Sequence, residues 1–89
     1  MRQREVEIIN KLGLHARASA KLTQLAAKYQ CDVSLARNGR KVNAKSIMGV
    51  MMLAAEQGSQ IEVATAGPQA NEALAAIREL VEARFNEPE

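Results

Sequence analysis

The 89-residue sequence lacks tryptophan and has only one tyrosine and one phenylalanine. Its hydrophobic residues, 47% of the chain, are therefore almost all Ala, Leu, Ile, Val and Met. A small RNA-binding module normally stacks bases on aromatic side chains, which are scarce here. The net charge of +2 comes from cations scattered among ten acids rather than gathered in a basic stripe. We therefore expect no nucleic-acid partner.

One cysteine, Cys31, and one histidine, His15, are too few for an internal disulfide or a metal-ligand set. We expect Cys31 to be a small buried hydrophobe at the start of a strand. A glycine-rich nucleotide-binding loop is absent, as are a secretion-like start and an apolar run near the roughly 18 residues that cross a bilayer. These absences predict a soluble, cytoplasmic protein that inserts into no membrane and needs no metal or cofactor.

The length predicts a single domain over residues 1–89, because two separate cores would each be too small. The apolar spacing changes period several times and predicts the order strand, helix, strand, strand, helix, strand, helix. The expected elements are a strand at 5–8, a helix from Ala16, a strand at 31–35, a short edge strand around Val42, a helix at 47–53 or 47–55, a strand at 60–66 and a final helix whose apolar face includes Phe85.

Local residues predict where these elements begin and end. Asn38-Gly39 is typical of a type I′ hairpin turn, because both residues tolerate positive φ. The Ser46 hydroxyl is expected to cap the second helix, and Gly58 to end it. Pro68 is expected in the first turn of the last helix, where its missing N–H costs nothing.

These elements combine most simply as an α+β open-faced sandwich, with three helices on one face of a four-stranded, largely antiparallel sheet (βαββαβα). A right-handed crossover makes the first two strands parallel and leaves a gap between them. We expect the strand at 60–66 to fill that gap. The other face of the sheet should be open to solvent and carry Glu5, Glu7, Asp32, Ser34 and Glu62.

The segment Gly13-Leu14-His15-Ala16-Arg17 places the only imidazole of the chain at the start of a helix. The first turn of a helix leaves amide groups without partners and favours an anion. Arg17 can fork onto two phosphate oxygens. This pattern indicates phosphate chemistry at His15, although a lone histidine is more often a plain capping residue and a lone arginine a solvated charge.

Together with Lys45-Ser46-Ile47-Met48-Gly49-Val50-Met51 and the order of elements, this segment resembles the histidine-containing phosphocarrier family, HPr. The resemblance spans nearly the whole chain. It implies that His15 accepts a phosphoryl group on Nδ1 from enzyme I of the phosphoenolpyruvate-dependent phosphotransferase system, with Arg17 beside it. The group would then pass to an enzyme II A-type acceptor, so that the chain is a carrier rather than an independent enzyme.

The sequence departs from the family at Ala18, where proline is usual; Ala18 keeps a backbone donor and loosens the first turn. We expect altered transfer rates rather than lost chemistry. Ser46 matches the serine that an HPr kinase/phosphorylase modifies in many bacteria, which predicts a regulatory site in addition to its role as a cap.

A docking surface for these partners is expected around His15. The core is the more common place for any one of the apolar residues after Ser46, but flexible thioethers also suit a surface that fits several partners. Two lysines could rim the patch and steer acidic partners. The candidate docking residues are Ala16, Lys21, Lys45, Ile47, Met48 and Met51.

One alternative keeps the same surface without the chemistry: a regulatory interaction module that binds partners and carries no phosphoryl group. The branch of the pathway also stays open. The segment 45–51 resembles sugar-branch HPr, whereas 60–63 with Gly67-Pro68-Gln69 resembles the nitrogen-related relative. In either case we expect a monomer.

Overall fold

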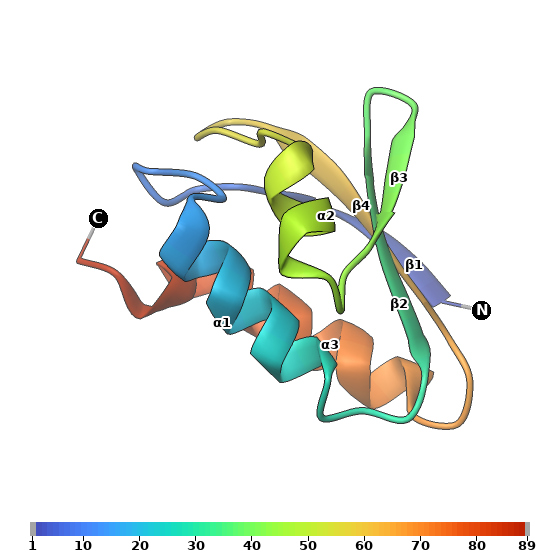
Figure 1. Ribbon diagram of the computed structural model, residues 1–89. Helices are drawn as coiled ribbons and strands as arrows, with labels where there is room; N and C mark the ends of the chain where they lie inside the picture. The colour runs from blue at the N-terminus through green and yellow to red at the C-terminus, as the bar shows by residue number, and fades with distance from the viewer. Residues whose placement is uncertain (1, 89) are drawn as a thin grey trace.

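The computed structural model of the protein describes residues 2–88. Strands and helices follow one another along the chain in the order that the sequence predicts (Figure 1). The last helix is followed by one short left-handed turn, η1. The elements are β1 (Arg2–Glu7), α1 (Ala16–Ala26), β2 (Asp32–Arg37), β3 (Arg40–Asn43), α2 (Ile47–Met52), β4 (Gln60–Ala66), α3 (Ala70–Glu82) and η1 (Arg84–Asn86).

The four strands form one antiparallel sheet in the order β1-β4-β2-β3. Strands β1 and β2 are parallel to each other and are separated by β4, which confirms the position predicted for residues 60–66. The three helices lie together on one face of the sheet (Figure 1). The structure is therefore the open-faced α+β sandwich that the apolar periods predict.

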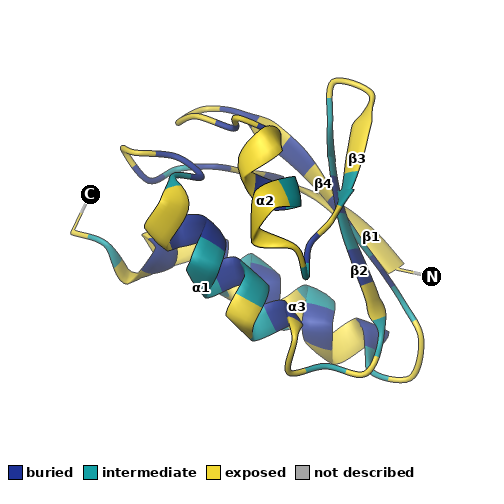
Figure 2. Ribbon diagram, in the orientation of Figure 1, coloured by how far each residue is buried: buried dark blue, intermediate teal, exposed yellow. Residues whose placement is uncertain are grey.

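Burial alternates along the strands as expected for a sheet with one covered face. In β4, Ile61, Val63 and Thr65 are buried, whereas Gln60 and Glu62 are exposed. Helices α1 and α3 each turn a buried stripe toward the sheet, but α2 is mostly exposed (Figure 2). The core therefore lies between the sheet and the two long helices, and the predicted open face is confirmed.

The hairpin between β2 and β3 confirms the prediction for Asn38 and Gly39, which have φ values of 52° and 82°. Residues with positive φ at both central positions match the twist of the flanking strands. The return strand β3 is four residues long and forms an edge of the sheet. It carries Val42, as predicted.

Helix α2 ends at Met52 with Leu53 as its C-cap, close to the nearer of the two predicted ends, whereas the prediction that it stops near Gly58 is wrong. The chain leaves the helix through Ala54, which has a φ of 50°. The side chain of Arg37 reaches across from β2, and its Nη1 donates to the carbonyls of Leu53 and Ala54 at 2.9 and 3.0 Å. Because a guanidinium satisfies these carbonyls, the helix can end without a glycine cap.

The last helix also differs from the prediction at both ends. It begins at Ala70 with Gln69 as its N-cap, so Pro68 lies in the turn before it rather than in its first turn. The backbone N–H of Gln69 donates to the carbonyl of Gln30 at 3.3 Å, which holds this turn against the chain before β2. Phe85 is fully buried but belongs to η1, beyond the end of the helix.

Cys31 directly precedes β2, which starts at Asp32, close to the predicted place at the start of the strand. It is half-buried and packs against the edge of the core, so the expectation of full burial is wrong. The backbone at Gly67 approaches Cys31 closely: a Cβ at Gly67 would lie 3.1 Å from the Cα of Cys31. Among the described residues, no helix is long and apolar enough to span a membrane.

Gly13 joins the loop before α1 to the segment after α2. Its φ is +66°, and a Cβ there would lie 2.5 Å from the carbonyl oxygen of Ala55. The next residue, Leu14, donates its N–H to the same oxygen at 2.8 Å. Only glycine allows the two backbones to approach this closely, because a side chain would be both strained and in collision. The contact fixes the chain two residues before His15.

We predict that Gly13→Ala lowers the free energy of unfolding by roughly 2 kcal/mol or more, because left-handed strain and a backbone collision add. Gly58→Ala is the matched control: its φ is +91°, but a Cβ there has nothing within 4 Å. It should lose only the strain, about 1 kcal/mol. Urea unfolding of the three proteins measures both values, and equal losses would contradict the close approach at Gly13.

Candidate functional site

His15 is the N-cap of α1, as the sequence predicts. Its backbone is extended, with φ −73° and ψ −179°, and its carbonyl accepts the first bond of the helix from Ser19 N–H at 2.9 Å. The Ser19 hydroxyl turns back and donates to the carbonyl of Leu14 at 3.0 Å. The loop and the first turn are thus tied together around His15. The His15 side chain remains 28% exposed, so a partner can reach it.

The first turn of α1 is an open anion site. No side chain caps it and no acidic residue lies in it, within the described part of the chain. The amide groups of Ala16 and Arg17 belong to this turn and have no acceptor inside the helix. An anion bound here would meet these donors and the positive end of the helix dipole.

A depression of about 750 Å³ opens beside the imidazole. His15 and Arg17, which the sequence analysis paired, both line it, and the exposed Ala16 lies between them. Lys11 adds a further cation to its wall. The carboxylate of Glu87 lines the same depression, so its charged lining consists of two cations and one anion. The space and the net positive charge suit a phosphate-sized anion bound next to His15.

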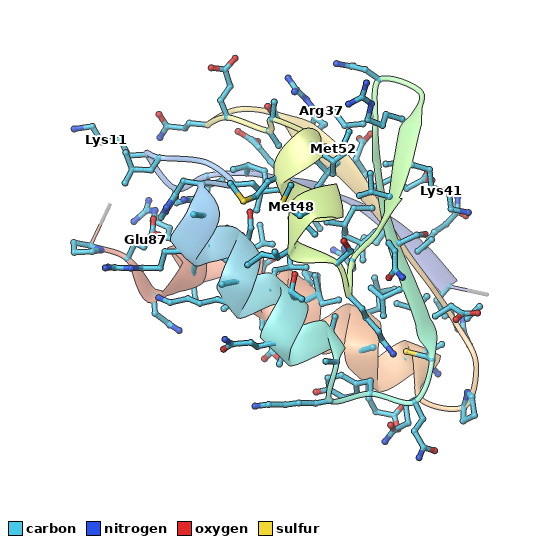
Figure 3. The ribbon with its side chains drawn as sticks, in the orientation of Figure 1. Lys11, Arg37, Lys41, Met48, Met52 and Glu87 are labelled. Atoms are coloured by element: carbon cyan, nitrogen blue, oxygen red, sulfur yellow. The ribbon has the colours of Figure 1, made fainter. Side chains whose placement is uncertain are left out.

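Glu87 completes this site. Its Oε2 lies 2.5 Å from Nε2 of His15, and its Oε1 accepts a bond from Nδ2 of Asn10 at 3.0 Å. The same Asn10 nitrogen donates to the carbonyl of Gly13 at 2.9 Å. Figure 3 shows Glu87 beside the first turn of α1. Its carboxylate is therefore held in the same network as the loop that carries His15.

Several groups act on the pKa of Glu87 in opposite directions. Burial disfavours the charged carboxylate and raises the pKa, but hydrogen bonds from His15 and Asn10 and the charges of His15 and Lys21 outweigh it. The pKa of Glu87 therefore lies below its ordinary value. The carboxylate is ionised at neutral pH and accepts from Nε2 of the ring.

Neither Glu87 nor Asn10 was predicted from the sequence to belong to the site. Glu87 is 72 residues from His15 along the chain, and no spacing rule connects them. A short acidic segment after a helix is usually solvated, so its composition does not indicate a residue of the site. Asn10 directly precedes the turn at Gly13, and its complete burial is the sign of a structural role that only the fold reveals.

Ser46 confirms its predicted role as a cap. It precedes α2, and its hydroxyl oxygen accepts a bond from Gly49 N–H at 3.2 Å. The residue is exposed. Its oxygen is therefore accessible from solvent while it satisfies one amide of the first turn.

The apolar residues of α2 lie mainly on the surface, so the core interpretation for them is wrong. Val50 is the buried residue of this six-residue helix. Met48 is 68% exposed, and Ile47, Met51 and Met52 are exposed as well. Figure 3 shows Met48 and Met52 on the outer side of α2. The other apolar side chains of this helix therefore lie in solvent.

The two candidate lysines are held by backbone carbonyls. Lys21 Nζ donates to the carbonyl of Phe85 at 2.6 Å, close to the segment that carries Glu87. Lys45 Nζ donates to the carbonyl of Tyr29 at 3.0 Å. Tyr29 follows the C-terminal end of α1, so Lys45 lies at the opposite end of that helix from His15.

Within residues 2–88, no three His, Cys, Asp or Glu side chains gather as a metal site would require. The imidazole of His15 is accessible at a helix N-terminus and lies beside the Arg17 side chain. This arrangement is typical of a small α+β protein that can hold a phosphoryl-sized anion at one histidine. A family model described as the PTS HPr component phosphorylation site matches residues 2–83. The chain belongs to the HPr family and has the role of a phosphoryl carrier in the phosphotransferase system.

Individual relatives agree with this family assignment. The phosphocarrier protein HPr of Cupriavidus necator is 60% identical over 89 residues, covering both chains completely. The crystal structure of an HPr from Thermoanaerobacter tengcongensis is 39% identical, covers both chains completely and has a TM-score of 0.96. The resemblance stated from the motifs is therefore confirmed, as is the fold.

The oligomeric state is less uniform among similar structures. Crh of Bacillus subtilis, 40% identical over 94% of this chain and 97% of its own, has a TM-score of 0.76 and is described as a swapped dimer. A single chain of this fold is thus compatible with exchange of an element between two copies. The monomer stays a prediction.

We predict that Glu87→Gln destabilises the protein near neutral pH and that this loss fades as the pH falls. The pKa of Glu87 is lowered by folding, so the ionised carboxylate stabilises the fold above its ordinary value of 4.5, and that contribution disappears as the pH falls through the lower folded value. Urea unfolding across the acidic range measures the effect. Glu79→Gln, at an exposed position of α3, should change stability little at any pH. A constant loss for Glu87→Gln would contradict the linkage.

Proposed function

We propose that this chain carries a phosphoryl group on Nδ1 of His15, between enzyme I and enzyme II A-type acceptors. The observation that carries the proposal is the place of His15, 28% exposed at an N-terminus that no side chain caps within residues 2–88. The choice of Nδ1 follows the family resemblance. It agrees with the contact of the other ring nitrogen, Nε2, with Glu87.

The transfer is a displacement at phosphorus. The lone pair on Nδ1 of His15 attacks the phosphoryl group of the donor, a new N–P bond forms and the donor's bond to phosphorus breaks. Arg17 and the first-turn amides of α1 stabilise the oxygens during the transfer. In the second transfer a nucleophile of the acceptor attacks the phosphorus, the N–P bond breaks and its electron pair returns to Nδ1 of His15. Because these donors are few and near the surface, they hold the group without trapping it.

Partners would dock on the surface formed by Ala16 and the exposed face of α2, Ile47, Met48 and Met51. These apolar side chains are exposed, and thioethers adapt to surfaces of different shape. Helices α1 and α2 pack against each other, so the patch and His15 belong to one side of the molecule. Lys21, beside the C-terminal segment, and Lys45, near the C-terminal end of α1, add positive charge that favours acidic partners. We place this carrier in the cytoplasm as a monomer.

The carrier function predicts acid-labile label on His15 after incubation with enzyme I and labelled phosphoenolpyruvate. His15→Ala should take up none. Arg17→Lys should be labelled about tenfold more slowly, because it loses a forked bond of roughly 1.5 kcal/mol. Arg78→Lys is the matched control on α3, where the guanidinium only pairs with Glu82 at 3.7 Å. A native chain that takes up no label while binding its partners would support the regulatory interaction module instead.

We further propose that Ser46 is a regulatory phosphorylation site for an HPr kinase/phosphorylase. Its hydroxyl is exposed at the start of α2, among the docking residues. A phosphate there would add about two negative charges beside the patch and disfavour acidic partners.

We expect purified HPr kinase and ATP to label the native chain at Ser46, and the product to receive phosphoryl from enzyme I more slowly than the unmodified protein. Ser46→Ala should take up no label from the kinase. Because this variant also loses the bond to Gly49, its stability is measured in parallel. An unlabelled native chain would refute the regulatory role and leave the cap unaffected.

A further inference from the structure

The contact between Glu87 and His15 has a chemical consequence for the carrier reaction. We propose that Glu87 is a positioning residue, whose carboxylate keeps the proton on Nε2 of His15 and leaves Nδ1 as the nucleophile. The inference rests on the proposed phosphoryl transfer at His15. It assigns a role to a residue beyond position 83, where the family model stops matching.

The carboxylate is held from both sides. One oxygen lies 2.5 Å from Nε2 of His15, and the other accepts from Asn10 at 3.0 Å. Asn10 is fully buried and also donates to the carbonyl of Gly13, in the loop that leads to His15. The Glu87 side chain is only 10% exposed. A surface carboxylate that met the ring by chance would be solvated and without a buried partner.

The backbone before Glu87 is strained in order to reach this place. Arg84, Phe85 and Asn86 have φ values of 56°, 54° and 61°. Asparagine tolerates the left-handed conformation, but it costs about 1–2 kcal/mol each at Arg84 and Phe85. The fully buried ring of Phe85 and the bond from Lys21 to its carbonyl hold the turn. Such strain persists only where surrounding contacts over-determine it, and it gathers at functional sites.

The proton on Nε2 decides which ring nitrogen can attack. In a neutral imidazole one nitrogen carries hydrogen and the other a lone pair, and a carboxylate at Nε2 selects the form whose lone pair is on Nδ1. When Nδ1 of His15 forms its bond to phosphorus and the donor's bond breaks, the ring retains the Nε2 proton and becomes positive. The Glu87 carboxylate is placed to stabilise that charge.

The same contact assists the second half of the relay. A positively charged ring releases phosphoryl more readily than a neutral one. When the N–P bond breaks, the charged ring leaves as neutral imidazole, whereas a neutral ring would have to leave as an anion. By holding the Nε2 proton, Glu87 keeps the ring in that state. Within the described residues, His15 and Lys21 lower the pKa of Glu87 by their charges, and Lys11 and Arg17 line the same depression. The charges of His15 and Lys21 favour the ionised form of the Glu87 carboxylate.

The first test observes the ring itself and needs no phosphoryl transfer. In the unphosphorylated native protein, ¹⁵N and ¹H NMR should show the neutral His15 ring protonated at Nε2, with this proton exchanging slowly with water. In Glu87→Ala the Nδ1-protonated form should appear, and exchange should be about tenfold faster, because a bond to a charged acceptor is lost. Glu79→Ala removes an exposed carboxylate from α3 and should leave the ring unchanged.

The second test measures transfer from the phosphorylated protein to an enzyme II A-type acceptor at several pH values. With Glu87→Ala the rate should fall more steeply as the pH rises above neutral, by about tenfold relative to the native chain, as the ring loses its Nε2 proton. A merely structural role of Glu87 would lower the rate equally at every pH. Glu79→Ala should follow the native profile.

The outcomes separate the two proposals. An unchanged ring form together with an unchanged pH profile in Glu87→Ala would overturn the role of Glu87. Faster transfer by that variant would also overturn it, and would identify the carboxylate as a competitor for the phosphoryl site. If the native chain takes up no phosphoryl group, the carrier function fails. The NMR comparison still decides whether Glu87 determines which ring nitrogen of His15 carries the proton.

Discussion

The close contact between the backbones at Gly13 and Ala55 determines where the functional residues of this protein lie. It joins the loop before α1 to the segment after α2, which are also linked by the backbone bonds of Ile8 with Gly58 and Ser59. His15 follows this contact by two residues, and α2 ends three residues before it. The contact at Gly13 thus fixes the chain next to His15 against the segment that leaves the exposed apolar helix. The sheet supports this arrangement without forming part of the site.

Much of the fold could be predicted because its causes are local. Alternation along β4, the helical stripe of α1 and the turn at Asn38 and Gly39 each follow from a few neighbouring residues, and chain handedness then restricts the strand order. The errors occur where a distant group decides. Arg37 ends α2 by reaching across from β2, so the helix stops before Gly58. No rule of sequence spacing relates that arginine to those carbonyls.

The site likewise contains residues that local sequence predicts and residues that only distant contacts bring into place. His15 and Arg17 are two residues apart, and the helix start makes their relation visible from the sequence. Glu87 reaches the ring through a left-handed turn held by a buried phenylalanine, and such a turn has no residue preference that announces it. The exposure of Met48 could be stated only as one of two alternatives, since a short apolar helix looks the same in sequence whether it faces the core or solvent. Burial is a property of the whole fold.

The methionines of α2 give this surface a chemical weakness. A thioether that lies in solvent is open to peroxide, which converts it to a polar, chiral sulfoxide. Met48, Met51 and Met52 are all exposed, whereas the core formed by the described residues contains no methionine. Oxidative stress would therefore alter the face proposed to dock partner proteins while leaving the folded framework and the imidazole intact. The adaptability that thioethers give to recognition comes with a dependence on the cell's capacity to reduce them.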